Sequence, residues 1–204
     1  MKLFETRTAP NPRRVRMFLA EKGLLDQVEL VQVDIEKGEN LSPEFVARNP
    51  MKKVPVLELD DGLCLSETPA ICRYLDEVSD EGSLFGTTPK ERAIIDMWEH
   101  RMESMVLYPA LFAFQHITGF FKDRMTPVED FGKESAKNFM KSLPVLDAQL
   151  ANNEWIAGSQ FSIADITAIC AIDFARIVKV RVGDEYPNIQ RWYAAMKERP
   201  SYAA

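Results

Sequence analysis

The feature that most constrains the fold is a change of pattern near residue 80. Before it, strand-like and helix-like segments alternate, and after it every segment has helical spacing. The first helical stretch, residues 12–22, has Val15, Phe18 and Leu19 at i, i+3, i+4. The other segments of this part are strands at 2–5, 28–33, 54–59 and 63–65, a short helix near 43–48 and a helix from 67 to about 77.

The resulting order is β-α-β-α-β-β-α. A helix between the first two strands makes them parallel, and the Asp61-Gly62 turn makes the last two a hairpin. A small mixed sheet with helices on its faces is expected, which is the pattern of a thioredoxin-like domain.

The second part is expected to be an all-α helical bundle. Its predicted helices are 91–117 with a kink at Pro109, 128–150 with a bend at Pro144, one from Ser162, and 189–199. Ser162 and Asp165 form a structural capping box. The prediction is a two-domain α+β protein: residues 1–79, a linker at 80–89, and an all-helical domain at 90–204.

Charge and composition exclude several function classes. A formal net charge of −6 argues against nucleic acid as a partner, because that affinity comes largely from lysine and arginine. No segment resembles a signal peptide or approaches the roughly 18 apolar residues of a membrane span, so a cytoplasmic protein without membrane contact is expected. The three cysteines lack CxxC spacing and nearby histidines, so we expect reduced, partly buried thiols and no metal site.

The junction between the first strand and the first helix is the first candidate site. Asn11 is a favoured N-cap and Pro12 a favoured first helical residue, so free N–H groups and a positive half-dipole are expected there. Such a place stabilises a thiolate, yet the segment has no cysteine, so the sulfur has to come from a ligand. Thr8 and Asn11 can donate to it; the alternative is that they only order the turn and cap the helix.

Two further segments suit a peptide ligand. A cis Val54-Pro55 bond would turn the Val54 backbone outward to pair with an extended peptide, and the alternative is a trans proline that opens the strand. At the start of the third helix, hydroxyls and N–H groups suit a carboxylate, and Glu67 could accept from an ammonium. The alternative for that segment is plain helix capping.

Together these segments resemble the glutathione transferase superfamily along essentially the whole chain. The resemblance is carried by Glu39-Asn40, residues 43–45, 49–55, 67–71, Tyr74-Leu75, 161–165 and 186–192. It implies glutathione as cosubstrate and no metal. It also implies that Val54, beside Pro55, pairs with the cysteinyl part, and that Glu67 and Thr68 hold the γ-glutamyl end. Lys52 or Lys53, and Asn40, would face the glycine carboxylate.

The resemblance also bears on the catalytic type. Phe4 stands where tyrosine-type classes place their hydroxyl, and no cysteine is available. What remains is a serine/threonine-type or asparagine-containing site, similar to the nu-like bacterial and fungal branch, with Thr8 or Asn11 as the catalytic donor. Ala9 occupies the usual hydroxyl position in one of two alignments.

The resemblance further implies an electrophile pocket and a homodimer. Its candidate lining residues are Met102, Met105, Tyr108, Phe112, His116 and Arg176. The alternative is that most are core residues and that His116 is a surface histidine. The expected activity is conjugation of glutathione to small hydrophobic electrophiles. A glutathione-dependent disulfide or peroxide reductase and a non-catalytic partner-binding module are the alternatives.

Overall fold

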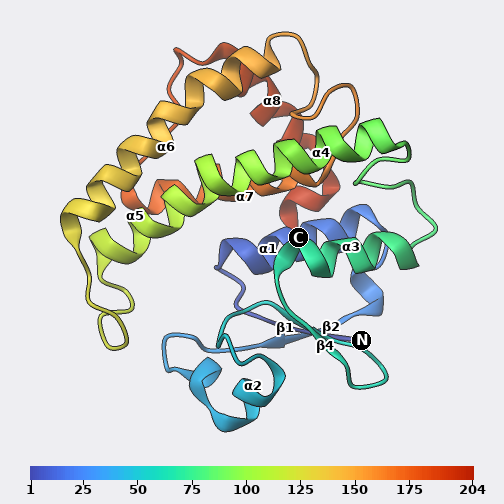
Figure 1. The fold of residues 1–204 in the computed structure, drawn as a ribbon, viewed down its shortest axis with the longest axis vertical. Coiled ribbons are helices and arrows are strands. Elements are labelled where there is room, and N and C mark those ends of the chain that lie inside the picture. Colours follow the sequence, from blue (N-terminus) through green and yellow to red (C-terminus); the bar gives the residue numbers. More distant parts are fainter. The chain divides into compact units, whose positions relative to one another are not determined.

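A computed structural model describes all residues from Met1 to Ala204, in two compact units (Figure 1). The first unit is Met1–Ser83 together with Pro200–Ala204, and the second is Leu84–Arg199. The boundary therefore falls inside the expected 80–89 linker, and the last five residues belong to the first unit rather than to the helical one. In the first unit, the Arg13 guanidinium lies over the Tyr202 ring, 4.9 Å from the centre of that ring. The Ser201 hydroxyl donates to the Glu21 carboxylate.

The first unit contains the expected mixed sheet, with strand order β2-β1-β3-β4. β1 pairs parallel with β2 and antiparallel with β3, and β3 pairs antiparallel with β4. The thioredoxin-like order is confirmed. The strands are β1 Lys2–Glu5, β2 Glu29–Gln32, β3 Val56–Glu58 and β4 Cys64–Leu65, and the helices are α1 Pro10–Glu21, α2 Pro43–Arg48 and α3 Thr68–Val78.

The start of α1 differs from the prediction. Ala9 is the N-cap, at φ −83° and ψ 141°, and Pro10 is the first helical residue, so Asn11 lies inside the first turn and does not cap the helix. Both Pro10 and Pro12 suit a first helical position, because the ring fixes φ and the missing N–H has no partner to lose there. The earlier proline prevails because it keeps Ala9 out of the helical region.

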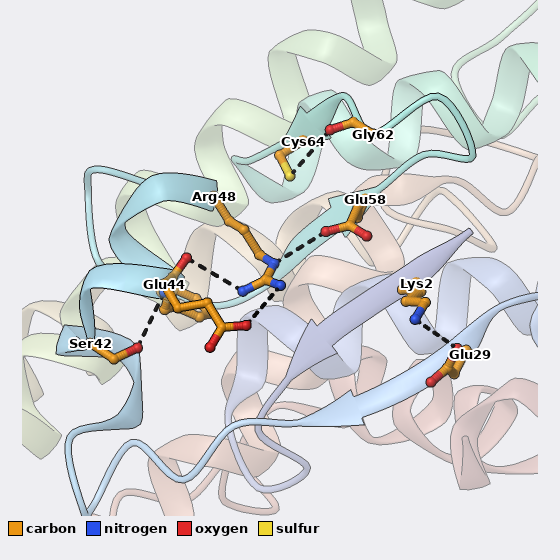
Figure 2. A network of polar contacts seen from close by, with 9 residues as sticks. Lys2, Glu29, Ser42, Glu44, Arg48, Glu58, Gly62 and Cys64 are labelled. Atoms are coloured by element: carbon orange, nitrogen blue, oxygen red, sulfur yellow. Dashed lines mark hydrogen bonds and ion pairs between the residues drawn. The ribbon is translucent and has the colours of Figure 1, made fainter.

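Helices cover both faces of this sheet, with α1 and α3 on one side and α2 on the other (Figure 1). On the α2 side Phe4, Val33, Phe45 and Val56 form a buried cluster. The Arg48 guanidinium lies over the Phe4 ring, 4.5 Å from its centre. It also pairs with Glu58 at 3.1 Å and Glu44 at 3.2 Å, which fixes the end of α2 to β3 (Figure 2).

The second unit is all-helical, as expected. Its helices are α4 Pro89–Met102, α5 Tyr108–Thr118, α6 Glu129–Leu150, α7 Ile163–Ala175 and α8 Pro187–Glu198. The predicted single helix 91–117 is divided by a π-helical turn at Glu103–Leu107, just before Pro109. Pro109 cannot donate to the carbonyl one turn earlier, and the wider turn accommodates that lost bond. Pro144 lies inside α6 without ending it.

Asp165 joins three segments of the second unit. Its fully buried carboxylate accepts from Ser162 N at 3.0 Å, Ser162 Oγ at 3.2 Å, Ile156 N at 2.9 Å and Trp192 Nε1 at 2.9 Å. Burial raises the pKa of Asp165 to about 6, although each of these donors lowers it. The structural capping box is confirmed, and it also anchors α8.

The cysteine thiols are all free, as expected: Cys72 and Cys170 are buried, and Cys64 is partly buried. Burial, with a smaller contribution from Glu58, raises the pKa of the Cys64 thiol, so this sulfur is not an activated thiolate. No helix has the length and apolar character needed to cross a bilayer. No group of three or more histidine, cysteine or acidic side chains is placed to hold a metal ion.

Candidate functional site

Strand register brings the candidate segments of the first unit to one end of its sheet. Phe4 pairs with Val56, so the segment that leaves β1 and the segment that enters β3 lie at the same end. Leu57 pairs with Leu65, which brings the segment after β4 to that end as well. The turn at residues 6–11, the loop at 49–55 and the start of α3 therefore share one edge.

The first turn of α1 has few free hydrogen-bond donors, and most of them belong to Asn11. Pro10 and Pro12 have no N–H, while Ala9 N donates to the Thr6 carbonyl at 3.0 Å. The Asn11 N–H has no acceptor. Arg14 Nη1 donates to Asn11 Oδ1 at 2.9 Å, which occupies the amide oxygen and leaves the Asn11 Nδ2 group as a donor. The Thr8 side chain is exposed and has no hydrogen-bond partner.

A buried ion pair supports this turn from beneath. Arg16 Nη1 donates to the carboxylate of Glu5, and both side chains are almost completely buried. Arg16 Nη2 also donates to the Arg7 carbonyl at 2.9 Å, and Gln32 Nε2 donates to Glu5 at 2.5 Å. Glu5, the last residue of β1, is thus tied to α1 and β2, and Arg16 also ties α1 to the backbone just before Thr8.

The loop before β3 contains the cis Val54-Pro55 bond that was one of the two sequence hypotheses, and the trans alternative was wrong. The Val54 N–H and C=O make no hydrogen bond with the rest of the chain. Pro55 is buried, and β3 begins only at Val56, two residues later than predicted. An unpaired donor and acceptor on one residue can bind the backbone of an extended peptide.

Two buried asparagines hold this loop in shape. Asn40 Nδ2 donates to the Lys52 carbonyl at 2.7 Å, and Asn49 Nδ2 donates to the Lys53 carbonyl at 2.8 Å. Asn49 was missed as a functional residue, although its position between a helix end and Pro50 was a turn signal. Asn40 is buried in this supporting contact, and no ligand is needed to explain its position.

The two candidate lysines are exposed on the same loop. Lys52 has φ 58°, in the left-handed region that favours glycine. Lys53 follows directly, and neither lysine has a hydrogen bond or ion pair from its ammonium group.

The start of α3 carries a strained residue. Glu67 has φ 66° and ψ 115°, is exposed, and makes no side-chain capping hydrogen bond. Glu67 is the N-cap residue of α3 and its carbonyl accepts from Ile71 N at 3.0 Å, so its backbone caps the helix while its carboxylate does not. Thr68 is buried at the first helical position, and Pro69 follows without an N–H. Strain of this kind, about 1–3 kcal/mol, persists where function requires the side chain in one place.

The second unit gathers some of the predicted electrophile-pocket residues. Tyr108 and Phe112 are about 40% exposed, and their ring centres lie 6.3 Å apart. Phe131, which the sequence did not single out, lies 5.6 Å from Phe112 and 4.9 Å from His116. His116 Nδ1 accepts from Val128 N at 2.9 Å. We call Tyr108, Phe112, His116 and Phe131 the aromatic patch.

The other pocket candidates differ in burial and position. Met102 is only 2% exposed and belongs to the core of the second unit, in agreement with the core alternative. Met105 is partly buried in the π-helical turn. Arg176 follows α7 in a segment that packs on α5, and it lines a cavity with Tyr193.

Comparisons with known proteins agree with this geometry. Residues 8–78 match the glutathione S-transferase N-terminal domain, and residues 105–200 match the glutathione S-transferase C-terminal domain. Glutathione S-transferase 2 of Saccharomyces cerevisiae is 37% identical over 203 residues, which cover 98% of this chain and 87% of the relative.

Solved structures are similar over the full length. A glutathione S-transferase domain-containing protein from Marinobacter aquaeolei has a TM-score of 0.96 at 41% identity, covering 99% of this chain and 100% of that one. Gtt2 from Saccharomyces cerevisiae has a TM-score of 0.95 at 36% identity, covering 100% and 99%. The cis proline loop, the thioredoxin-like sheet, the helical second unit and these full-length similarities lead to one conclusion: the chain belongs to the glutathione S-transferase family, alongside fungal and bacterial members.

Proposed function

We propose that the first unit binds glutathione and stabilises its thiolate, and that the thiolate attacks small hydrophobic electrophiles. The observation that carries the proposal is the unpaired Val54 backbone beside the cis bond, at the same end of the sheet as Asn11 and Glu67. Val54 pairs with the cysteinyl residue, Glu67 accepts from the γ-glutamyl ammonium, and Thr68 donates to its carboxylate. Lys52 or Lys53 pairs with the glycine carboxylate.

The proposed chemistry needs the sulfur as a thiolate. The thiol gives its proton to solvent, the sulfur forms a bond to an electrophilic carbon, and the leaving group departs with its electron pair. Hydrogen bonds to the ionised sulfur lower its pKa from about 8.5, and each unit corresponds to about 1.4 kcal/mol. Asn11 is the preferred donor over Thr8, because Arg14 fixes its amide while Thr8 has no such support.

Two variants test this assignment. In Asn11→Ala we expect the pKa of bound glutathione to rise by about one unit, and in Thr8→Ala by much less. The measurement is the ultraviolet absorbance of the thiolate as a function of pH, with glutathione saturating. Equal small shifts in both variants would mean that neither side chain donates to the sulfur.

Binding and rate assays distinguish the transferase from the two alternatives, a glutathione-dependent reductase and a non-catalytic partner-binding module. Calorimetry with glutathione is expected to give heat, and its absence at millimolar ligand would favour a non-catalytic module. An aryl halide and a small mixed disulfide are then compared as substrates. A rate with the disulfide alone would make the protein a glutathione-dependent reductase.

Glu67 offers a test in which stability and binding change in opposite directions. Glu67→Gly removes the Cβ that makes φ 66° costly, so the free energy of unfolding should rise by about 1 kcal/mol after the entropy cost of glycine. Glutathione affinity should fall about 10- to 100-fold, because a charge-assisted hydrogen bond is lost. Glu67→Ala keeps the Cβ, so it should lose the same affinity without the gain in stability. Urea unfolding and calorimetry measure both quantities.

We further propose that the aromatic patch contacts the electrophile and that the protein is a homodimer, as the family resemblance implies. Phe112→Ala should raise KM for an apolar aryl halide while glutathione affinity stays unchanged. Analytical ultracentrifugation tests the dimer. A monomer at micromolar concentration would contradict it.

A further inference from the structure

A cavity in the second unit is lined by none of the residues proposed to hold glutathione and by none of the aromatic patch. It has a volume of about 190 Å³ and lies between the end of α7, the segment that follows it, and α8. Its apolar lining comes from Ile172, Val182 and Ile189, and its polar lining includes Arg176, Arg181 and Tyr193. The cavity thus combines two guanidinium groups with apolar side chains.

The walls of this cavity are held by hydrogen bonds. Gln190 Nε2 donates to the Val182 carbonyl at 3.3 Å and to the Gly183 carbonyl at 3.2 Å, which fastens the connecting segment to α8. Val180 N donates to the Ala175 carbonyl at 3.2 Å, and Lys179 adopts φ 63° to allow the turn. The two sides of the cavity are thus fixed before any ligand enters.

The residues that line the cavity include two arginines and no carboxylate. Asp173 accepts from Tyr193 Oη at 2.5 Å and lies 3.9 Å from Arg176 Nη1. The Glu185 carboxylate lies beside Gly183 on the connecting segment and forms no ion pair with Arg181. Arg176 Nη1 also donates to Tyr193 Oη at 3.3 Å. Arg181 is exposed and has no hydrogen bond or ion pair. Asp173 therefore pairs with Arg176, whereas Arg181 has no ion-pair partner.

Size and lining define the ligand class. The volume corresponds to roughly six waters at about 30 Å³ each, below the 300–1,000 Å³ of drug-sized pockets. One small ring or a short branched chain fits, and a carboxylate attached to it would meet a guanidinium fork that matches its geometry. We propose that this cavity binds a small monocarboxylate with an apolar body, through Arg181 and Arg176. The apolar lining favours it over inorganic phosphate.

This site is independent of the proposed glutathione chemistry. All its residues belong to the second unit, and none is a candidate for holding glutathione. Its test needs no glutathione and no turnover. A negative result here therefore leaves the proposed function unaffected, and the reverse also holds.

The experiment is an NMR titration of the full chain with benzoate. The amides of Val182, Ile189 and Tyr193 should shift saturably. Acetate, which lacks the ring, and benzamide, which lacks the charge, should each bind at least tenfold more weakly, as should inorganic phosphate. Arg181→Ala should raise the benzoate Kd about tenfold or more, since a charge-assisted hydrogen bond is lost.

The matched control removes a positive charge from the same segment outside the cavity. Lys179→Gly keeps the left-handed turn, because glycine accepts φ 63°, and should change the benzoate Kd less than twofold. Three outcomes would overturn the proposal: no saturable shift with benzoate, equal binding of benzamide, or an equal loss in Lys179→Gly and Arg181→Ala. Tighter binding of phosphate than of benzoate would likewise reject the monocarboxylate.

Discussion

Arg16→Met is expected to lower the free energy of unfolding by about 3–5 kcal/mol, because it leaves the Glu5 carboxylate buried without its cation. Glu5 is 0% exposed, and the remaining donor, Gln32 Nε2 at 2.5 Å, is neutral. The Arg7 carbonyl also loses its donor. Urea unfolding followed by circular dichroism measures the loss.

Two further variants make this prediction specific. Lys133→Met breaks an exposed ion pair, Lys133 Nζ to Glu129 at 2.7 Å, and should change the free energy of unfolding little, because solvent screens the pair. The double variant Glu5→Leu, Arg16→Met removes both buried charges and should be more stable than Arg16→Met alone. If Arg16→Met cost no more than Lys133→Met, the buried pair would not support the turn before Thr8.

Asp165→Ala is the second large effect, with an expected loss of about 4 kcal/mol. The change leaves the buried N–H groups of Ile156, Ser162 and Trp192 without an acceptor, at about 1–3 kcal/mol each before relaxation. It also detaches α8 from the start of α7. Asp184→Ala, at an exposed carboxylate without a partner, is the control and should stay within about 0.5 kcal/mol of the unsubstituted protein.

The stability contribution of Asp165 should also depend on pH. Its pKa is raised from 3.8 to about 6 by burial, so between these values the folded state binds the proton more tightly than the unfolded chain. Proton binding by Asp165 therefore adds about 3 kcal/mol to the free energy of unfolding. The whole of this amount is present below the pKa of the unfolded chain, and it is lost as the pH rises through the pKa of the folded state. The stability difference between the unsubstituted protein and Asp165→Ala should therefore shrink from pH 4 to pH 7. A difference that stays constant would mean that the carboxyl group does not titrate in this range.

Local sequence signals predicted the order of elements but not every boundary. Pro10 and Pro12 fit the first turn of a helix equally well by local rules, and the effect of Pro10 on Ala9 decides the start of α1. The π-helical turn before Pro109 was expected only as a kink, because sequence shows the lost hydrogen bond but not how the helix accommodates it.

The candidate site could be predicted from sequence where a backbone conformation requires a particular residue type. Pro55 indicated where a cis bond could occur. The order of the motifs along the chain indicated the three segments of the site, which are the turn at 6–11, the loop at 49–55 and the start of α3. The strain at Glu67 was not predictable, since a glutamate at positive φ leaves no trace in residue type. In the second unit, helical spacing alone cannot distinguish the exposed Phe112 from the buried Met102, because which face is covered depends on the other helices.

The last residues of the chain have a consequence for how the protein is made. Ser201 and Tyr202 pack on α1, although about 180 residues of chain separate them from Glu21 and Arg13. During synthesis β1 to α3 leave the ribosome early, yet the contacts of Ser201 and Tyr202 with α1 cannot form until the whole helical unit has been translated. The first unit therefore reaches its final packing last, and a fragment ending at Ser83 would present an uncovered face of α1 to chaperones and proteases.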